Sequence, residues 1–120
     1  ASLVGVVAQR LVRNLCQDCR EVYYPSSKLL EEFQYAGNVR HPFSRSRGCS
    51  QCYESGYRGR TGLYELFEST PQLRDMINSE ASLDELRAQH RGPTLFSEGM
   101  RLAEAGMTSL EEVGRVAMSD

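Results

Sequence analysis

The sequence predicts an α+β fold, in which a four-cysteine module with short strands lies between an N-terminal helix and a C-terminal helical subdomain. Two Cys-x-x-Cys pairs mark the module, and apolar residues before the first pair recur at three- and four-residue steps. Helix-start signals punctuate the last third of the chain. The predicted segments are 1–15, 16–68 and 69–120.

The first expected helix covers Leu3–Leu15, because its apolar residues fall on one side of a helical wheel. After the first cysteine pair, Glu21–Tyr24 has the composition of a short strand. A second helix is expected over Ser27–Ala36, with Gly37 placed to end it. An irregular, arginine-rich segment, residues 38–48, then leads to the second cysteine pair.

Beyond that pair, the sequence predicts a glycine-rich turn over residues 56–62 that feeds a strand over Thr61–Glu68. A helix is expected to begin at Thr70-Pro71, because proline fits the first helical position. A further helix is expected over Pro93–Ala105, with a stop at Gly106. Capping boxes, in which a hydroxyl and a glutamate satisfy free amides at a helix start, are expected at Ser82–Glu85 and Thr108–Glu111.

Composition and charge exclude several protein classes. Hydrophobic residues make up 40% and charged residues 25% of the chain, which is typical of a soluble globular domain and not of a disordered or fibrous one. The net charge of −2 gives no overall attraction to nucleic acid or anionic lipid. The apolar run Ala1–Ala8 is too short to span a bilayer and has no basic stretch before it, so neither a signal peptide nor a membrane anchor is expected.

The cysteines are the strongest functional signal. The pairs Cys16/Cys19 and Cys49/Cys52 can each present two sulfurs to one tetrahedral ion, which is typical of a closed, structural zinc site. The alternatives are two disulfides or four unrelated buried thiols, which the absence of a secretory signal disfavours. Twenty-nine residues separate the pairs, so a helix is expected between them. The side chains expected to offset the thiolate charge are Arg13, Arg20 and Arg47.

No catalytic residue is assigned from the sequence. Lys28 is the only lysine, and Pro-Ser-Ser precedes it, so this chain has no Gly-x-x-x-x-Gly-Lys phosphate-binding loop. The glycine-rich residues 56–62 precede a strand instead of opening a helix, which disfavours a phosphate cradle there. A closed zinc site also lacks the open position that catalysis needs.

Arginines offer the other candidate contacts. Arg10 and Arg13 lie three apart on the polar side of the first expected helix, where they are either solvated or contact an acidic or phosphate group outside this chain. Other arginines, interleaved with Tyr53 and Tyr57, favour the alternative of a zinc-ribbon module that binds nucleic acid. This set comprises Arg40, Arg45, Arg47, Arg58 and Arg60. A third hypothesis is a redox protein with exchangeable dithiols.

Four motifs, taken in order, resemble one family. They are residues 9–19 (QRLVRNLCQDC), 48–52 (GCSQC), 56–66 (GYRGRTGLYEL) and 108–113 (TSLEEV). Together they are similar to the C-terminal part of the type II secretion and type IV pilus assembly ATPases, the E-type or PilB-like traffic ATPases. The resemblance extends over essentially all 120 residues.

The resemblance implies a bacterial, cytoplasmic ATPase that forms homohexamers and is held at the inner membrane through platform proteins. It implies structural zinc at the four cysteines, with ATP and magnesium bound only by an upstream RecA-like core, whose last helix would be residues 1–15. Residues that would contact that core or a neighbouring subunit are Arg10, Arg13, Arg58 and Arg60. The chain itself would transmit force and would not hydrolyse ATP, and no nucleic-acid partner is expected.

Overall fold

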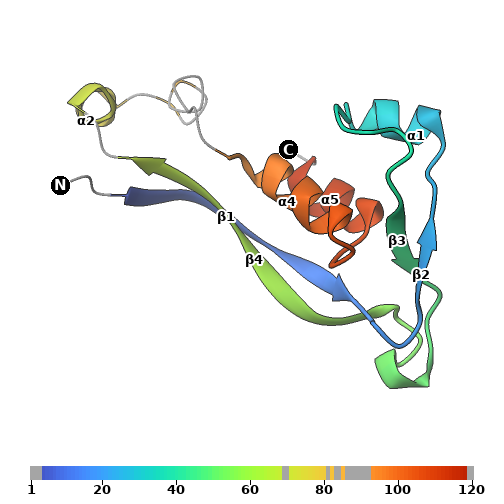
Figure 1. Ribbon diagram of the computed structural model, residues 1–120. Helices are drawn as coiled ribbons and strands as arrows, with labels where there is room; N and C mark the ends of the chain where they lie inside the picture. The colour runs from blue at the N-terminus through green and yellow to red at the C-terminus, as the bar shows by residue number, and fades with distance from the viewer. Residues whose placement is uncertain (1–3, 69–70, 81, 83–84, 86–92, 119–120) are drawn as a thin grey trace.

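The computed structural model describes residues 4–68, 71–80, 82, 85 and 93–118 and shows a small α+β protein with antiparallel strands, as predicted (Figure 1). Its elements, in chain order, are β1 (Val4–Leu15), β2 (Arg20–Tyr23), α1 (Ser27–Glu32), β3 (Phe43–Ser46), the 3-10 helix η1 (Ser50–Cys52), β4 (Tyr57–Glu68), α2 (Pro71–Asn78), α4 (Leu95–Glu104) and α5 (Leu110–Ala117). Strands β1 and β4 form one two-stranded sheet, and β2 and β3 form another.

The first element is a strand, so the helix predicted over Leu3–Leu15 is wrong. β1 pairs with β4 in antiparallel orientation along its length. The helix-like spacing arises because Val12 and Leu15 are both buried, but in different surroundings. Val12 packs in the core beneath α4, whereas Leu15 ends the strand and donates its amide to the Met107 carbonyl at 2.9 Å. A spacing of three therefore reflects two burial sites and not one helical face.

Strands β1 and β4 form a two-stranded ribbon. Two irregularities in this β1–β4 ribbon also interrupt the alternation of side chains between its two faces. Val7 is an extra residue on β1, and farther along Arg58 and Gly59 on β4 lie opposite the single residue Asn14. Gly59 has a φ of 79°, a conformation that glycine adopts without strain in such bulges. Each bulge shifts the alternation by one residue. Because β4 starts at Tyr57, most of the segment expected to be a turn belongs to this strand.

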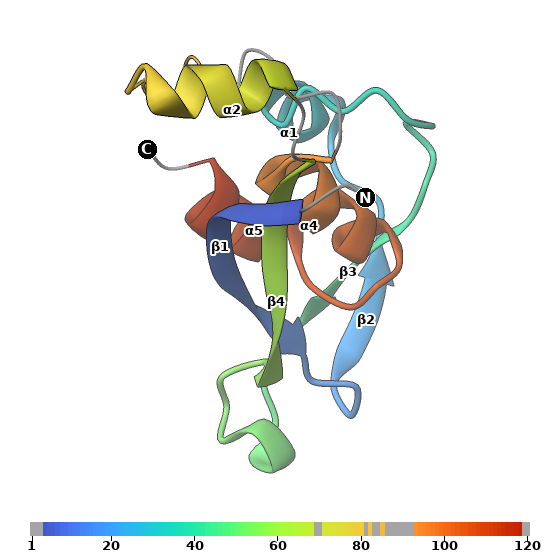
Figure 2. The same ribbon diagram turned by 90° about the vertical axis from the view of Figure 1, so that its left-hand side faces the viewer.

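Helices α4 and α5 pack on the ribbon and form the centre of the fold (Figure 2). One core cluster joins the two strands to both helices through Val12, Leu63, Leu95, Leu102 and Val116. A second cluster joins the helices to α1 and β3 through Leu30, Phe33, Phe43, Met100, Ala103, Leu110 and Val113. The helix pair thus ties the ribbon to the segment between the cysteine pairs.

The predicted signals hold at the end of α4 and, with a shift, at the start of α5, whereas α4 begins at Leu95 and not at the expected Pro93. Thr94 caps the start of α4, and Gly106, with a φ of 79°, follows its end as predicted. Ser109 caps α5 by accepting a hydrogen bond from the Glu112 amide at 3.0 Å. The cap therefore lies one residue later than predicted. Residues 108–111 and residues 109–112 both fit the capping-box pattern, and the structure uses the second.

The shorter elements agree with the sequence only in part. β2 matches its prediction closely, but its partner β3 lies inside residues 38–48, which were expected to be irregular. α1 begins at Ser27 as predicted and ends at Glu32, before the expected Ala36, and Gln34 has a φ of 50°. α2 begins at Pro71 as expected.

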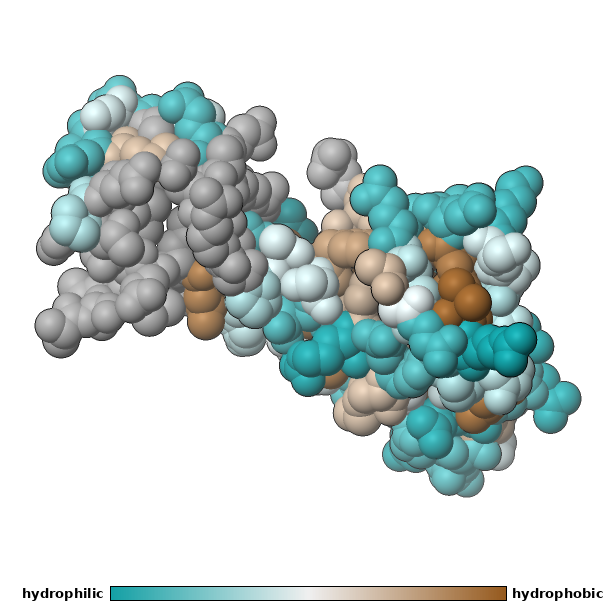
Figure 3. All heavy atoms as spheres, turned by 45° about the horizontal axis from the view of Figure 1, so that its top comes forward, coloured by the Kyte–Doolittle hydropathy of each residue, from teal (hydrophilic) through white to brown (hydrophobic). Residues whose placement is uncertain are grey.

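Two further expectations concern a later helix and the membrane. Ser82 and Glu85 make the expected capping contact, with the Glu85 amide 3.2 Å from the Ser82 hydroxyl. The helix expected to follow lies outside the described residues. Within the described ranges, no helix is both long and apolar enough to cross a membrane. The face of the molecule in Figure 3 is mostly hydrophilic, with separate hydrophobic patches.

Candidate metal centre

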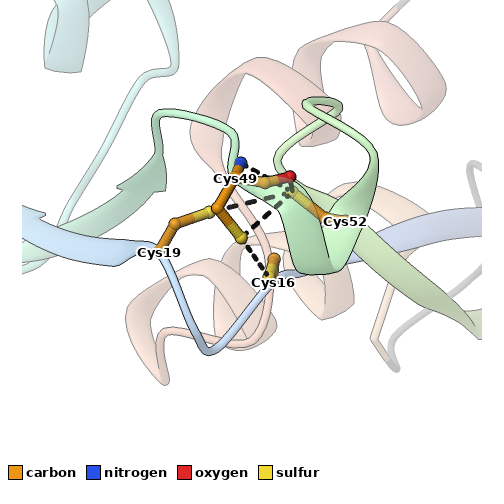
Figure 4. Close-up of side chains that lie close together, drawn as sticks. All are labelled: Cys16, Cys19, Cys49 and Cys52. Atoms are coloured by element: carbon orange, nitrogen blue, oxygen red, sulfur yellow. Dashed lines mark hydrogen bonds between the residues drawn. The ribbon is translucent and has the colours of Figure 1, made fainter.

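Two turns bring the four predicted cysteines together (Figure 4). Cys16 and Cys19 lie in the turn between β1 and β2, Cys49 is the N-cap of the 3-10 helix η1 before β4, and Cys52 is the last residue of that helix. The Sγ atoms are 3.8 Å apart for Cys16 and Cys49, 3.9 Å for Cys19 and Cys52, and 3.7 Å for Cys49 and Cys52. All four lie within 4.8 Å of one another.

These distances fit a tetrahedral metal site. Sulfurs placed about 2.3 Å from a central zinc ion at the corners of a tetrahedron lie about 3.8 Å from one another. A disulfide would require about 2.05 Å between the two sulfurs, and all four cysteines are free thiols. Four thiolates form the donor set of closed, structural zinc sites. The arrangement therefore suits a structural ion and leaves no protein-defined open position.

Backbone amides offset part of the charge that a thiolate cluster would carry. The amides of Cys49 and Gly56 both donate to the Cys52 sulfur at 3.2 Å. Burial raises the pKa of the Cys52 thiol, but hydrogen bonds from these amides and from the Cys49 and Cys19 thiols together outweigh burial, and the net pKa is lowered. Burial is the main cause of the raised pKa of Cys49. Cys52 is thus the thiol that this backbone best prepares to be a thiolate.

The second turn depends on an unusual backbone conformation. Gly48 has a φ of +100°, and a Cβ atom placed there would lie 2.7 Å from the Glu54 carbonyl oxygen. Tyr53 and Glu54 both adopt left-handed conformations, with φ values of 54° and 64°. The close approach at Gly48 leaves no room for a side chain, so glycine is required at this position.

Arg13, one of the predicted contact residues, binds α5 instead of the cysteines. Its main-chain amide lies 2.7 Å from the Glu112 carboxylate, and its guanidinium donates to both carboxylate oxygens. Glu112 is fully buried and also accepts hydrogen bonds from Arg115 at 2.8 and 2.9 Å. The Arg13 guanidinium stacks over the Tyr57 ring at 4.2 Å.

No pattern in the sequence pairs Arg13 with Glu112 or with Tyr57. The available signal was the spacing of three between Glu112 and Arg115 on a helix, which brings the two side chains together. Nothing local indicates a partner 99 residues away in the chain.

The other arginines expected to offset the cysteine charge also bind elsewhere. Arg20 donates to the Gly106 carbonyl at 3.3 Å, near the end of α4. Arg47 lies 3.5 Å from a Glu21 carboxylate oxygen, and Arg45 binds the other oxygen of that group at 3.0 Å. Among the described residues, charge at the cysteines is therefore offset by the Cys49 and Gly56 amides that donate to Cys52.

The remaining predicted contact residues lie on the surface. Arg58 pairs with Asp18 at 3.3 Å, with both side chains 57% exposed. Arg10 and Arg60 are exposed, and Arg10 donates to the carbonyl of its neighbour, Gln9. These exposed positions leave room for the predicted contacts with a core or subunit. Carboxylate pairing of Arg58, like that of Arg45 and Arg47, weakens the case for a continuous basic surface.

Known proteins similar to this chain point to one family. The family described as Type II/IV secretion system protein matches residues 1–115. Type II secretion system protein E of Pseudomonas aeruginosa is 38% identical, over 100% of this chain and 24% of that protein. Type II secretion system ATPase E of Vibrio cholerae is 40% identical, over 97% of this chain and 24% of that protein.

A pilus protein is also similar. Type IV pilus assembly ATPase TfpB of Acinetobacter baylyi is 35% identical, over 97% of this chain and 21% of that protein. The chain thus spans about a quarter of the length of the curated relatives it matches. Because the family match covers nearly all residues, the chain belongs to the Type II/IV secretion system protein family.

Proposed function

We propose that this chain is a zinc-stabilised, non-catalytic part of an ATPase that powers type II protein secretion or type IV pilus assembly. The names of the relatives support the ATPase assignment, and their length leaves about three-quarters of such a protein for other functions. In this proposal a RecA-like core elsewhere in the protein binds ATP and magnesium. The observation that carries the proposal is the near-tetrahedral spacing of four thiols in a chain of this family.

The proposed role of the cysteines is to hold two distant segments together. Zinc bound by the four thiolates would cross-link the end of β1 to the segment that leads into β4. The Cys16 amide already bonds to the Gly56 carbonyl at 2.9 Å across this junction. The cysteines would thereby fix the end of the β1–β4 ribbon at which Leu15 pairs with Tyr57.

The proposed mechanical role follows from the packing. The ribbon, the helix pair and the β2–β3 sheet share continuous core contacts, so a force applied to one would reach the others. We infer that this unit passes nucleotide-driven movement from the ATPase core to neighbouring subunits of a homohexamer or to inner-membrane platform proteins. It would act on the cytoplasmic side of that membrane.

The test is a secretion assay with the full-length protein that carries this chain. A variant with both Cys49→Ser and Cys52→Ser should lose bound zinc and at least tenfold of its secretion or piliation activity, while still binding ATP. The control is Arg101→Ala, which removes only an exposed ion pair with Glu98 on α4 and should behave as wild type. A zinc-free double variant that supports normal secretion would contradict the proposal.

A further inference from the structure

We propose that metal binding at the four cysteines and docking of α5 on the ribbon are coupled through Tyr57, Arg13 and Glu112. This inference rests on the proposed metal site but goes beyond its structural role, because it states that the metal controls a contact made by a separate helix. Figure 1 shows α5 alongside β1, with the cysteine turns at one end of the ribbon.

At the metal end, both cysteine turns position the residue before Tyr57. The Gly56 amide donates to the Cys52 sulfur at 3.2 Å, and the Gly56 carbonyl accepts from the Cys16 amide at 2.9 Å. A change in the sulfur arrangement would therefore move Gly56. Tyr57, the first residue of β4, would move with it.

The Tyr57 side chain connects this junction to the start of α5. Its ring lies against the Arg13 guanidinium at 4.2 Å, and its hydroxyl is 2.7 Å from the Ser109 hydroxyl. Ser109 is the N-cap of α5 and accepts from the Glu112 amide at 3.0 Å. Tyr57 therefore contacts both sides of the docking interface, the strand and the helix cap.

The last residues of β1 hold the same helix from a second direction. The Arg13 amide donates to Glu112 at 2.7 Å, and the Arg13 carbonyl accepts from the Thr108 hydroxyl at 2.7 Å. Two residues later, the Leu15 amide donates to the Met107 carbonyl at 2.9 Å. Cys16 follows directly, so the ligand-bearing turn and the docking contacts share one short piece of backbone.

Burial of Glu112 makes partial undocking of α5 from the ribbon unfavourable. Its carboxylate is fully buried and depends on Arg13 and Arg115, so a partly undocked helix would leave a buried charge without its partners. Coupling between two sites is reciprocal. If zinc favours docking by some factor, docking favours zinc binding by the same factor. A variant that leaves α5 largely undocked in the absence of zinc should therefore bind zinc more weakly, by up to that factor.

The experiment measures zinc affinity of the purified chain by competition with a chromogenic chelator. The path variants are Tyr57→Phe, which removes only the hydroxyl that reaches Ser109, and Glu112→Gln, which removes the buried charge. Ser26→Ala removes the N-cap of α1 and destabilises the fold without touching the path. Arg101→Ala, away from the path, is a surface control.

We expect at least a fivefold loss of zinc affinity in both path variants and less than a twofold change in both controls. The same affinity in all variants would overturn the coupling and leave the metal site standing. Equal losses in Ser26→Ala and Tyr57→Phe would also overturn it, because the effect would then reflect general stability. If Glu112→Gln fails to fold, the zinc affinity of Tyr57→Phe alone tests the coupling. A wild-type chain that binds no zinc would contradict the proposed function as well.

Discussion

Removal of the metal is expected to lower the free energy of unfolding of this chain by at least about 5 kcal/mol, a large fraction of the roughly 5–15 kcal/mol that is typical of folded proteins. The reason is that the free energy of binding zinc at the four thiols, which lie within 4.8 Å of one another, would contribute to folding, and the cross-link between the two cysteine turns would be lost with the ion. Guanidinium unfolding followed by circular dichroism, with zinc and then with excess chelator, measures the difference.

A cysteine variant provides the matched control for this prediction. Cys16→Ser removes one buried ligand and changes little else in volume. Its unfolding curve should resemble that of the chelated wild type, and added chelator should shift it little further. Identical curves for the wild type with and without chelator would contradict the prediction.

The second large effect is expected from Glu112→Ala, which should cost about 3 kcal/mol of folding stability. The change removes the shared partner of Arg13 and Arg115 and the acceptor of the Arg13 amide. Because both guanidiniums are partly exposed, the expected cost is at the low end of the range for breaking a buried pair. Glu98→Ala, which breaks the exposed pair with Arg101, should cost less than about 1 kcal/mol.

The contribution of Glu112 should also depend on pH. Burial raises the pKa of its carboxyl, but hydrogen bonds from Arg115 and Arg13 outweigh burial and lower the pKa to about 2. A folded-state pKa below the unfolded value stabilises the fold at neutral pH, and that stabilisation is lost as the pH falls from about 4.5 toward 2.

The informative quantity is the stability difference between wild type and Glu112→Gln, since the other pH-dependent contributions are shared by both proteins and cancel in the difference. It should be largest near pH 6 and shrink steadily below pH 4.5. A difference that stays constant over this range would show that the Glu112 charge does not contribute to stability.

The cysteine cluster could be predicted from the sequence because its geometry is encoded locally. A spacing of two residues sets the distance between the thiols of each pair, and four equivalent ligands define one site. The C-terminal end of α4 and the start of α2 were predictable for the same reason, since Gly106 and Pro71 act within one helical turn.

The strand β1 could not be predicted from periodicity, because its burial is set by distant parts of the chain. Val12 is covered by helices about 90 residues away, and the backbone amide of the buried Leu15 bonds to Met107 in the loop before α5. The bulge at Val7 further interrupts the two-residue alternation of β1 that identifies strands. The remaining indication of a strand was the four valines of residues 4–12, because β-branched residues are enriched in strands.

The Arg13–Glu112 contact shows the same limit. Both residues look like ordinary surface charges in sequence, on a predicted polar face and within a capping pattern. Arg13 and Glu112 come into contact because β1 pairs with β4 and α5 docks beside β1. Long-range electrostatic partners of this kind follow from the fold and not from local pattern.

The most direct test of the central claim is the zinc content of the chain purified without added metal, measured by native mass spectrometry. The proposed closed site predicts one zinc ion per chain, four thiols protected from alkylation, and loss of both properties in Cys49→Ser. A chain that carries no zinc, takes up none when it is supplied and exposes four reactive thiols would contradict the account.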